Sequence, residues 1–411
     1  MAERVLSFED ALAEVLQHAD TVEARPAAIR VPLLEAFGRV LAQAVVAERD
    51  QPPFARSTRD GFAVRAADLP EGGLHVVGTV RAGEQWIGDP LQDGETIEIM
   101  TGAPVPAGAD AVLMVEHGTF AEDNTLGAEE GRSLKSGENV VPRGAEARAG
   151  VELVPAGRVL GVAEIAVAAS CGYADVEVFP EPRVAILATG DELVELDGTP
   201  EDWQIRNSNS YALAALVTAE GGEAVRLPIA QDTREDLRRR ITEGRRADLL
   251  LLSGGVSMGK FDLVEEVLDG AGAEFLFTGT KIQPGRPLVF GRLPRADDGW
   301  TYFFGLPGNP ISTEVCFRLF VTPLLRALCG RTERAPRFSE AKLVDDVPGG
   351  ARVTRFLPAE ITGDWQGVHV RPVPWQGSGD LAANARANGF MVLPIGTEQF
   401  AAGETVRVLL R

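Results

Sequence analysis

The sequence predicts a multidomain protein of the α/β plus β class, in which a central parallel α/β sheet domain accompanies two smaller β domains. Residues 181–330 alternate strand-like and helix-like segments, which is typical of a parallel sheet covered by helices. Residues 49–145 and 331–411 contain short alternating runs broken by Gly and Pro, which favours small β domains. A chain of 411 residues has room for about two to four domains.

The N-terminal region, residues 1–48, is predicted to be largely helical. Ser7 is expected to cap a first helix, because Asp10 follows at the capping-box position. A second short helix is expected at residues 33–40. Residues 146–180 contain similar short segments and are expected to pack back on this region, so that the two stretches form one linker domain.

The first β domain, residues 49–145, combines short apolar strands with three polar or rigid loops. The loops are expected at residues 56–63, 100–110 and 137–146. The second of them is rich in small residues and prolines, which would allow a ligand to approach closely. Composition alone does not say that the loops form a site, since a pair such as Asp60-Gly61 is a common turn.

The central domain shows the clearest alternation of strands and helices. Its expected strands are residues 183–188, 224–229, 249–252 and 302–305, and its expected helices are residues 210–220, 234–244, 263–270 and 311–328. In open parallel sheets, ligands bind outside the carboxyl ends of the strands. The residues that follow each strand are therefore candidate site residues.

Composition excludes several classes of function. The formal net charge is −20, which is unfavourable for binding nucleic acid or an anionic membrane surface. Cys171, Cys316 and Cys329 are odd in number and scattered, so they indicate neither a disulfide framework nor a zinc site. The four histidines are far apart in the sequence, which gives little support to a histidine-based triad. Because neither a signal peptide nor a run of about 18 apolar residues is evident, we expect a cytoplasmic protein with no membrane partner.

The most informative segment is residues 249–262, Leu-Leu-Leu-Leu-Ser-Gly-Gly-Val-Ser-Met-Gly-Lys-Phe-Asp. A buried strand is followed by a glycine-rich turn and then by Lys260 and Asp262 at the start of a helix. Glycines allow a ligand to approach the backbone, and a helix N-terminus attracts anions. A carboxylate beside an anion indicates a cation between them. The segment therefore suggests a metal-assisted phosphate site, although a tight turn without a ligand explains it about equally well.

The same segment matches the first part of a P-loop, because residues 254–260 follow the pattern G-x-x-x-x-G-K. The next residue is Phe261, where a P-loop has the Ser or Thr that binds magnesium. No separate strand ending in aspartate obviously replaces that ligand. A P-loop nucleoside triphosphatase is therefore disfavoured.

Carboxylates follow three of the expected strands, at Glu192, Asp232 and Asp262. Each alone is weak evidence, since acidic residues often cap helices, and capping is the simpler explanation for Asp232. Together they would surround one crevice, where clustered negative charge favours a hard cation such as Mg²⁺. Lys281 and Arg286, around a Pro-Gly turn, would offer positive charge to a phosphate or would be ordinary solvated residues.

Several of these strings, in this order, resemble the molybdopterin molybdenumtransferase family, which is of the MoeA type and includes the C-terminal domain of gephyrin. The matching strings are Ser57-Thr-Arg-Asp-Gly-Phe-Ala, Met100-Thr-Gly-Ala-Pro-Val-Pro, Thr189-Gly-Asp-Glu-Leu, residues 253–262, Pro284-Gly-Arg-Pro and Leu306-Pro-Gly-Asn-Pro. The resemblance extends over nearly the whole chain. It implies four domains, with a molybdopterin-binding α/β domain and a C-terminal β-barrel-like domain, and an elongated homodimer. It also implies insertion of molybdate into adenylylated molybdopterin, with magnesium and with release of AMP.

The resemblance implies a set of site residues as well. Asp60, Thr101, Glu192 and Asp262 would be catalytic, and Glu192, Asp232 and Asp262 would bind the metal. The residues that would contact the pterin or its phosphates are Gly254, Gly255, Ser257, Gly259, Lys260, Lys281, Arg286, Pro307, Pro310 and Ser378. The cleft would lie between the α/β domain of one subunit and the β domain of the other. A molybdopterin adenylyltransferase and cofactor-accepting enzymes would be its partners.

The sequence departs from the family pattern in three places, of which Glu146, where an Asp is frequent, is the mildest. Gly279 and Gln283 stand where family members often carry basic residues, and Lys281 between them would substitute. Val141 stands where an arginine is frequent, and Arg143 would compensate. These departures leave open which basic residues contact an anion.

Two other functions stay open at this point. A molybdopterin adenylyltransferase has the same type of glycine loop, but such enzymes are usually a single α/β domain, so the β domains argue against it. A non-catalytic scaffold would keep the fold and would be free to lose the site carboxylates, which this chain retains. The sequence does not distinguish molybdate from tungstate, because both are tetrahedral dianions of similar size.

Overall fold

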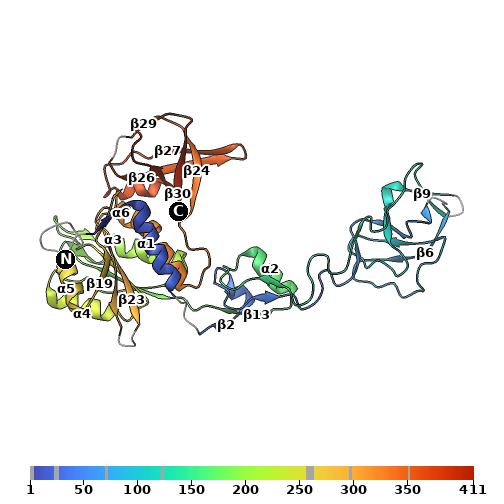
Figure 1. Ribbon diagram of the computed structural model, residues 1–411, viewed down its shortest axis with the longest axis horizontal. Coiled ribbons are helices and arrows are strands. Elements are labelled where there is room, and N and C mark those ends of the chain that lie inside the picture. Colours follow the sequence, from blue (N-terminus) through green and yellow to red (C-terminus); the bar gives the residue numbers. More distant parts are fainter. Residues whose placement is uncertain are drawn as a thin grey trace.

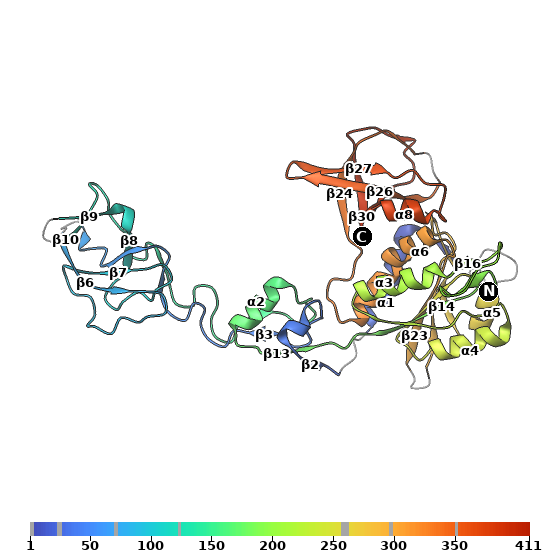
Figure 2. The same ribbon diagram turned by 180° about the vertical axis from the view of Figure 1, so that it is seen from behind.

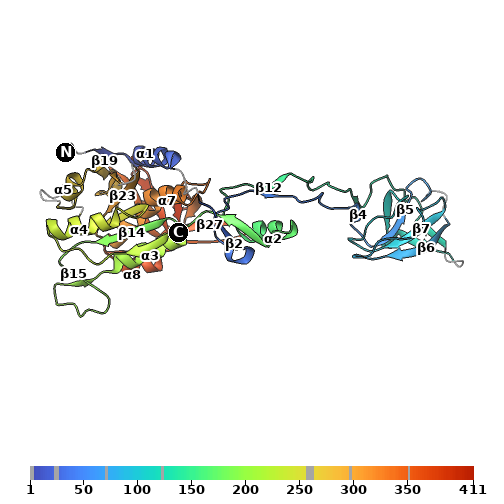
Figure 3. The same ribbon diagram turned by 90° about the horizontal axis from the view of Figure 1, so that it is seen from below.

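The computed structural model describes residues 4–22, 27–69, 73–121, 125–255, 263–295, 299–349 and 352–411. The molecule is elongated, with a β domain at one end, a narrow middle region, and an α/β sheet together with a β barrel at the other end (Figure 1). The views from behind and from below show the same separation (Figures 2 and 3). The predicted α/β plus β class is therefore confirmed.

The α/β region contains a six-stranded mixed sheet with the strand order β17-β14-β18-β23-β22-β19. Its parallel strands are β17 (Glu223–Arg226), β14 (Arg183–Ala188), β18 (Leu249–Ser253) and β23 (Trp300–Leu306). The strands β22 (Val289–Pro294) and β19 (Glu274–Phe277) extend the sheet in antiparallel fashion. The sequence analysis predicts only the parallel part, because the segment between α5 (Leu263–Gly270) and β23 lacks the strand–helix alternation on which that prediction rests.

Helices cover both faces of this sheet. They are α3 (Ser208–Ala219), α4 (Arg234–Gly244), α5 (Leu263–Gly270) and the run formed by α6 (Pro310–Cys316), η4 (Phe317–Val321) and α7 (Thr322–Leu328). The packing of strand β18 explains why its sequence is a run of leucines. Leu249 and Leu251 belong to the core shared with α3 and α7, whereas Leu250 and Leu252 belong to the core shared with α4 and α5. A strand that is buried on both faces has no polar side to alternate with. A small parallel pair, β15 (Leu193–Val194) and β16 (Ile205–Arg206), lies after β14.

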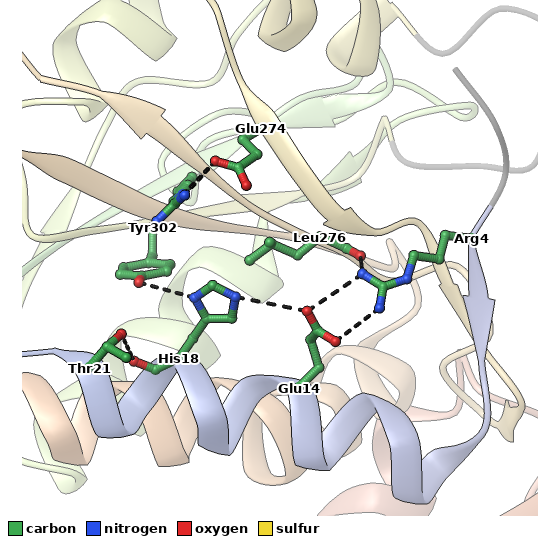
Figure 4. Close-up of polar contacts among 8 residues, drawn as sticks. Arg4, Glu14, His18, Thr21, Glu274, Leu276 and Tyr302 are labelled. Carbon is green, nitrogen blue, oxygen red and sulfur yellow. Dashed lines mark hydrogen bonds and ion pairs between the residues drawn. The ribbon is translucent and has the colours of Figure 1, made fainter.

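The first helix, α1 (Phe8–Thr21), packs on the α/β sheet. Its buried residues belong to the same core as β22 and β23, and β1 (Val5–Leu6) pairs with β20 (Gly279–Thr280). Figure 4 shows the polar contacts that hold the helix: His18 Nδ1 lies 3.3 Å from Tyr302 Oη, and Arg4 Nη2 lies 3.0 Å from Glu14 Oε2. The sequence analysis groups this helix with residues 146–180, whereas its apolar face is buried against the sheet.

The middle region consists of two short antiparallel ladders, one 3₁₀ turn and one helix. β2 (Ile29–Pro32) pairs with β13 (Asp175–Val178), β3 (Val45–Val46) pairs with β12 (Glu152–Val154), and η1 (Leu33–Ala36) and α2 (Val162–Ser170) pack beside them. The helix predicted at residues 33–40 is wrong beyond this 3₁₀ turn. Phe37 has an extended ψ of 127°, and Gly38 has a φ of 80°, so the chain leaves the helical conformation there.

The β domain at the far end is built on a six-stranded sheet with the order β8-β5-β7-β6-β10-β9. Its elements are β5 (Gly61–Val64), β6 (Leu74–Val80), β7 (Glu95–Ile99), β8 (Ala111–Met114), η3 (Val115–His117), β9 (Gly118–Phe120) and β10 (Thr125–Ala128). Phe62 and Val64 lie in one apolar core and Ala63 in another, so both faces of β5 are covered. A separate pair, β4 (Arg56–Ser57) and β11 (Val140–Val141), brings the first and third predicted loops together.

The C-terminal region is a closed five-stranded barrel with the order β26-β27-β24-β30-β28, closed by pairing of β26 with β28. Its elements are β24 (Phe338–Leu343), β25 (Val347–Pro348), β26 (Thr354–Asp364), β27 (Gly367–Pro372), α8 (Leu381–Arg386), β28 (Gly389–Leu393), β29 (Gln399–Phe400) and β30 (Thr405–Leu410). The strand β21 (Ile282–Gln283) pairs with β26, so the α/β region is attached to the barrel. Among the described residues, no helix is long and apolar enough to cross a membrane.

Candidate functional site

The carboxyl ends of the parallel strands meet at one edge of the sheet. Ala188 at the end of β14 is in register with Ser253 of β18, which is in register with Leu306 of β23. Thr189 forms an isolated parallel bridge with Ala230, so the loop after β17 joins the same edge. The four loops that the sequence analysis selected therefore lie next to one another.

The glycine turn after β18 lies close to the loop after β14. Gly254 and Gly255 have φ angles of 88° and 66°, a region that residues with a Cβ atom rarely adopt. A Cβ atom on Gly254 would lie 2.5 Å from the carbonyl oxygen of Thr189, and one on Gly255 would lie 2.6 Å from Val264 Cγ2. Glycine is thus required at both positions by the close approach of two loops. Of the other predicted residues of this turn, Ser257, Gly259, Lys260 and Asp262 lie outside the described residues.

Two aspartates approach each other beside this turn. Thr189 Oγ1 donates a hydrogen bond of 2.6 Å to Asp232 Oδ1, and the backbone nitrogen of Asp232 donates one of 3.3 Å to Asp191 Oδ1. Capping of α4 is done by Thr233, whose hydroxyl accepts from the backbone nitrogen of Asp236, so Asp232 is not the capping residue. Glu192 is exposed and follows directly after Asp191. The sequence analysis selected Glu192 and not its neighbour Asp191, which the structure brings to the backbone of Asp232.

Asn209, near the start of α3, connects the end of β18 with the loop after β23 and was also missed. Its Nδ2 atom lies 3.1 Å from Ser253 Oγ and 2.7 Å from the carbonyl oxygen of Gly308. The local sequence Asn-Ser-Asn at residues 207–209 is typical of a helix start, and Asn207 does cap α3. The bridging role of Asn209 depends on strand order, which a local pattern does not contain.

The loop after β23 brings the barrel to the same edge. Asn309 Nδ2 donates a 2.8 Å hydrogen bond to Ser378 Oγ, and the backbone nitrogen of Ile311 donates one of 3.0 Å to the carbonyl oxygen of Ser378. Pro310 begins α6, and the carbonyl oxygen of Pro307 accepts from a threonine hydroxyl of that helix. The structure thus places Pro307, Pro310 and Ser378 together, with Ser378 supplied by the C-terminal region.

The predicted basic residues lie in the segment between β19 and β22. Val289, the first residue of β22, is in register with Gly305 near the end of β23, so this segment is at the carboxyl edge as well. Lys281 and Arg286 are both exposed there. Gln283, which stands where the family often has a basic residue, is in register with Arg355 of β26. Nε of Arg355 is buried and has no hydrogen-bond partner among the residues that the structure describes. Strand pairing therefore supplies an arginine beside this position.

The loops of the β domain form a second cluster. Asp60 Oδ1 accepts hydrogen bonds of 2.6 Å from the backbone nitrogen of Thr101 and of 2.8 Å from its hydroxyl. The backbone hydrogen bond, followed by the hydroxyl one, lowers the pKa of Asp60 below its usual value, so the carboxylate is ionised at neutral pH. Asp60 and Thr101, which are far apart in sequence, are thus in direct contact.

Two arginines of the β-domain cluster are held by carboxylates. Arg56 Nη2 lies 2.9 Å from Glu146 Oε1, and Arg56 is in register with Val141 across the β4–β11 pair. Arg143 Nε lies 2.8 Å from Asp50 Oδ2. Arg143 as the replacement for the missing arginine at Val141 stays a prediction, because Arg143 pairs with Asp50 just as Arg56, which is in register with Val141, pairs with Glu146.

The two clusters are widely separated within one chain. Asp60 and Thr101 adjoin β5 and β7, which lie at one end of the molecule, whereas β14 and β23 lie at the other (Figures 1 and 3). A single chain therefore does not bring the two predicted halves of the site together. Among the described residues, no group of three or more acidic, His or Cys side chains is close enough to hold a metal ion.

Three family models match the chain. The MoeA N-terminal region (domain I and II) matches residues 6–172, the probable molybdopterin binding domain matches residues 185–327, and the MoeA C-terminal region (domain IV) matches residues 340–410. The carboxyl edge of the sheet described above lies within the second match.

Individual relatives agree with the family models. A protein named molybdopterin molybdenumtransferase from Staphylococcus aureus is 35% identical over 408 residues, which covers 97% of this chain and 94% of the relative. A protein with the same name from a Nostoc species is 35% identical over 398 residues, covering 92% and 88%. The solved structure of a molybdopterin biosynthesis MoeA protein from Pyrococcus horikoshii OT3 has a TM-score of 0.79 at 28% identity and covers 99% of this chain and 100% of that one. A second solved structure of a MoeA protein from the same organism has a TM-score of 0.74 at 31% identity and covers 99% of both chains. The chain therefore belongs to the MoeA family of molybdopterin molybdenumtransferases.

Proposed function

We propose that the protein is a molybdopterin molybdenumtransferase, which inserts molybdate into adenylylated molybdopterin and releases AMP. The observation that carries this proposal is the arrangement at the carboxyl edge of the sheet. A glycine turn that only a residue without Cβ can form lies against Thr189, which holds Asp232 by a 2.6 Å hydrogen bond. Such an edge suits a phosphate-bearing ligand. The names of full-length relatives give the reaction class.

The α/β edge is proposed to bind the pterin and its phosphates. Gly254 and Gly255 would let the backbone approach the phosphates, and Lys260, Lys281 and Arg286 would offset their negative charge. Asn209 would keep the loops after β18 and β23 at a fixed distance, since it bonds to both. Ser378 would close the pocket from the barrel side through its bond to Asn309.

Magnesium is proposed as the cation at this edge. The described oxygen donors, the carboxylates of Asp191 and Asp232, are of the hard type that Mg²⁺ prefers, and Glu192 and Asp262 would complete the set. One carboxylate oxygen of Asp232 accepts from Thr189, which fixes the orientation of the group. When bound, the cation would neutralise phosphate charge and polarise the phosphoanhydride.

The β-domain cluster is proposed to position the incoming oxyanion. An ionised Asp60 would repel molybdate, so its role is more simply to fix Thr101, which donates both of its short hydrogen bonds to this carboxylate. Because both donors of Thr101 are used by Asp60, this pair would hold the two loops together and would leave the contact with the oxyanion to a neighbouring group. Exposed Arg59, next to Asp60 in the chain, would supply the positive charge.

We infer that the enzyme acts as a homodimer in which each site combines two subunits. The support is geometric, because the two clusters lie at opposite ends of one chain. The four domains would then be residues 1–48 with 146–180, residues 49–145, residues 181–330 and residues 331–411. Cytoplasmic localisation and partnership with the adenylyltransferase are part of the same proposal.

The main test follows AMP release from adenylylated molybdopterin in the presence of molybdate and Mg²⁺. The wild-type protein should release AMP, whereas Asp232→Ala should release little and keep its fold. An adenylyltransferase would instead produce adenylylated pterin, and a scaffold would do neither, so each of those results would refute the proposal.

A complementation experiment tests the shared site. Asp60→Asn and Asp232→Ala are co-expressed with different tags, and mixed dimers are isolated. If each site combines two subunits, one site in each mixed dimer contains neither substitution, and about half of the wild-type activity per dimer should return. If each site lies within one chain, both sites carry a substitution and no activity should return.

A further inference from the structure

A polar cavity lies at the opposite end of α3 from the carboxyl edge of the sheet. Its volume is about 270 Å³, and it is lined by the end of α3, by η4 and α7, by the linker after α7 and by the end of β30. Three separate parts of the chain therefore meet there: the α/β region, the linker and the last strand of the barrel. None of its lining residues belongs to the proposed active site.

The cavity is rich in arginine. The arginines that line it are Arg318, Arg326, Arg331, Arg337 and Arg411. Two carboxylates pair with four of them: Glu220 lies 2.8 Å from Arg326 and 3.5 Å from Arg331, and Glu314 lies 2.8 Å from Arg318 and 3.0 Å from Arg411. The positive charges thus exceed the negative ones, although the whole chain has a net charge of −20. Within the described ranges, the guanidinium group of Arg337 has no carboxylate partner.

Two buried donors of this cavity have no hydrogen-bond partner in the described part of the chain. They are Nε of Arg331 and the hydroxyl of Thr322, a residue that is only 3% exposed. A buried donor without an acceptor is costly, and native proteins seldom leave one. Burial, together with the charges of Arg326 and Arg337, lowers the pKa of Arg331. Both atoms are closed off from solvent within the wall of the cavity, so the cavity itself offers the unbalanced positive charge of its arginines.

We propose that this cavity binds a small phosphate-type oxyanion, no larger than pyrophosphate. The planar guanidinium group matches the oxygens of a phosphate with two parallel hydrogen bonds, and several of them together favour a multiply charged anion. The volume lies just below the range of about 300–1,000 Å³ that is usual for drug-sized ligands, so the ligand is a small one. The bound anion would link the arginines of α7 and the linker to Arg411 at the end of the barrel.

The test is isothermal titration of the purified full-length protein with pyrophosphate, in a chelator that removes divalent cations. Under these conditions the carboxylates of the active site disfavour an anion, so binding there is suppressed. Arg337→Gln is the informative variant because its side chain is exposed and unpaired among the described residues, and its loss should leave the fold intact. Arg407→Gln is the matched control: it is an exposed arginine on β30 that does not line the cavity.

We expect saturable binding by the wild-type protein and an affinity about 10- to 100-fold lower in Arg337→Gln, as for loss of one hydrogen bond to a charged group. Arg407→Gln should bind as the wild type does, and so should Lys281→Gln, which removes an exposed positive charge only from the proposed active site. Parallel titrations with inorganic phosphate, AMP and molybdate show which oxyanion the cavity binds most tightly. AMP should bind more weakly than pyrophosphate because it is larger. The absence of saturable binding, equal binding by the Arg337 and Arg407 variants, or loss of binding in Lys281→Gln would each overturn the proposal.

Discussion

Replacement of Gly254 by alanine tests whether the glycine turn must approach the loop after β14. The φ angle of 88° costs a residue with a Cβ atom about 1–2 kcal/mol. The new Cβ atom would also lie 2.5 Å from the carbonyl oxygen of Thr189, a backbone atom that must move, and overpacking of this kind costs a further ~1–3 kcal/mol. Because Thr189 also holds Asp232, we expect the rate of AMP release to fall more than tenfold. A tenfold fall corresponds to an increase of about 1.4 kcal/mol in the activation free energy.

Gly403→Ala is the matched control for this substitution. Gly403 has a φ angle of 86°, and a Cβ atom there would meet no atom of the described residues within 4 Å. The Gly403→Ala variant should therefore lose only the backbone contribution of about 1–2 kcal/mol to its free energy of unfolding, and it should keep full activity. The assays are AMP release and hydrogen exchange of β14 and β18, followed by mass spectrometry. Equal exchange and equal activity in the two variants would refute the steric argument.

Three further predictions concern single side chains. Thr189→Val removes the 2.6 Å hydrogen bond to Asp232 and should lower the affinity for Mg²⁺ by about 10- to 100-fold. An unchanged Mg²⁺ concentration for half-maximal activity would contradict this prediction. Asp60→Asn should lower activity without changing the magnesium dependence, because the carboxylate acts through Thr101. In the wild-type protein, the stabilisation that goes with the lowered pKa of Asp60 is present above pH 3.8 and is lost at lower pH, and acid unfolding can follow this loss. Burial lowers the pKa of His18, so the unfolded state binds more protons and stability should fall as the pH drops below 6.5. Thermal unfolding between pH 5 and 7.5 checks this, and His18→Gln should remove the dependence.

Local patterns in the sequence were sufficient for the helices and parallel strands of the α/β region. The bounds of β14, α4 and α5 agree with the prediction, because their apolar periodicity and their flanking turns are both strong. The antiparallel strands β19 and β22 were not predicted, since their pairing is decided by neighbours distant in sequence. The first helix was predicted, but the surface it packs on was not, because an apolar stripe does not identify its partner.

The candidate site shows the same division. The glycine turn and Asp232 could be selected from the sequence, because glycine and acidic residues that follow a parallel strand lie where ligands bind in open α/β sheets. Asp191, Asn209 and Arg355 could not, because each acquires its place only when loops or strands far apart in the chain are brought together. Arg143, which pairs with Asp50, stays a prediction as the replacement for the missing arginine.

The sequence by itself determined the family, the class of fold and the chemistry of the strand ends, because these depend on residue types in a fixed order. Only the tertiary structure decided that Asp60 and Thr101 touch, that they lie far from the α/β edge of their own chain, and that the arginines of α7, the linker and β30 share one cavity. The physical reason is that order along the chain fixes local conformation, whereas distance between segments is fixed by how their buried faces pack.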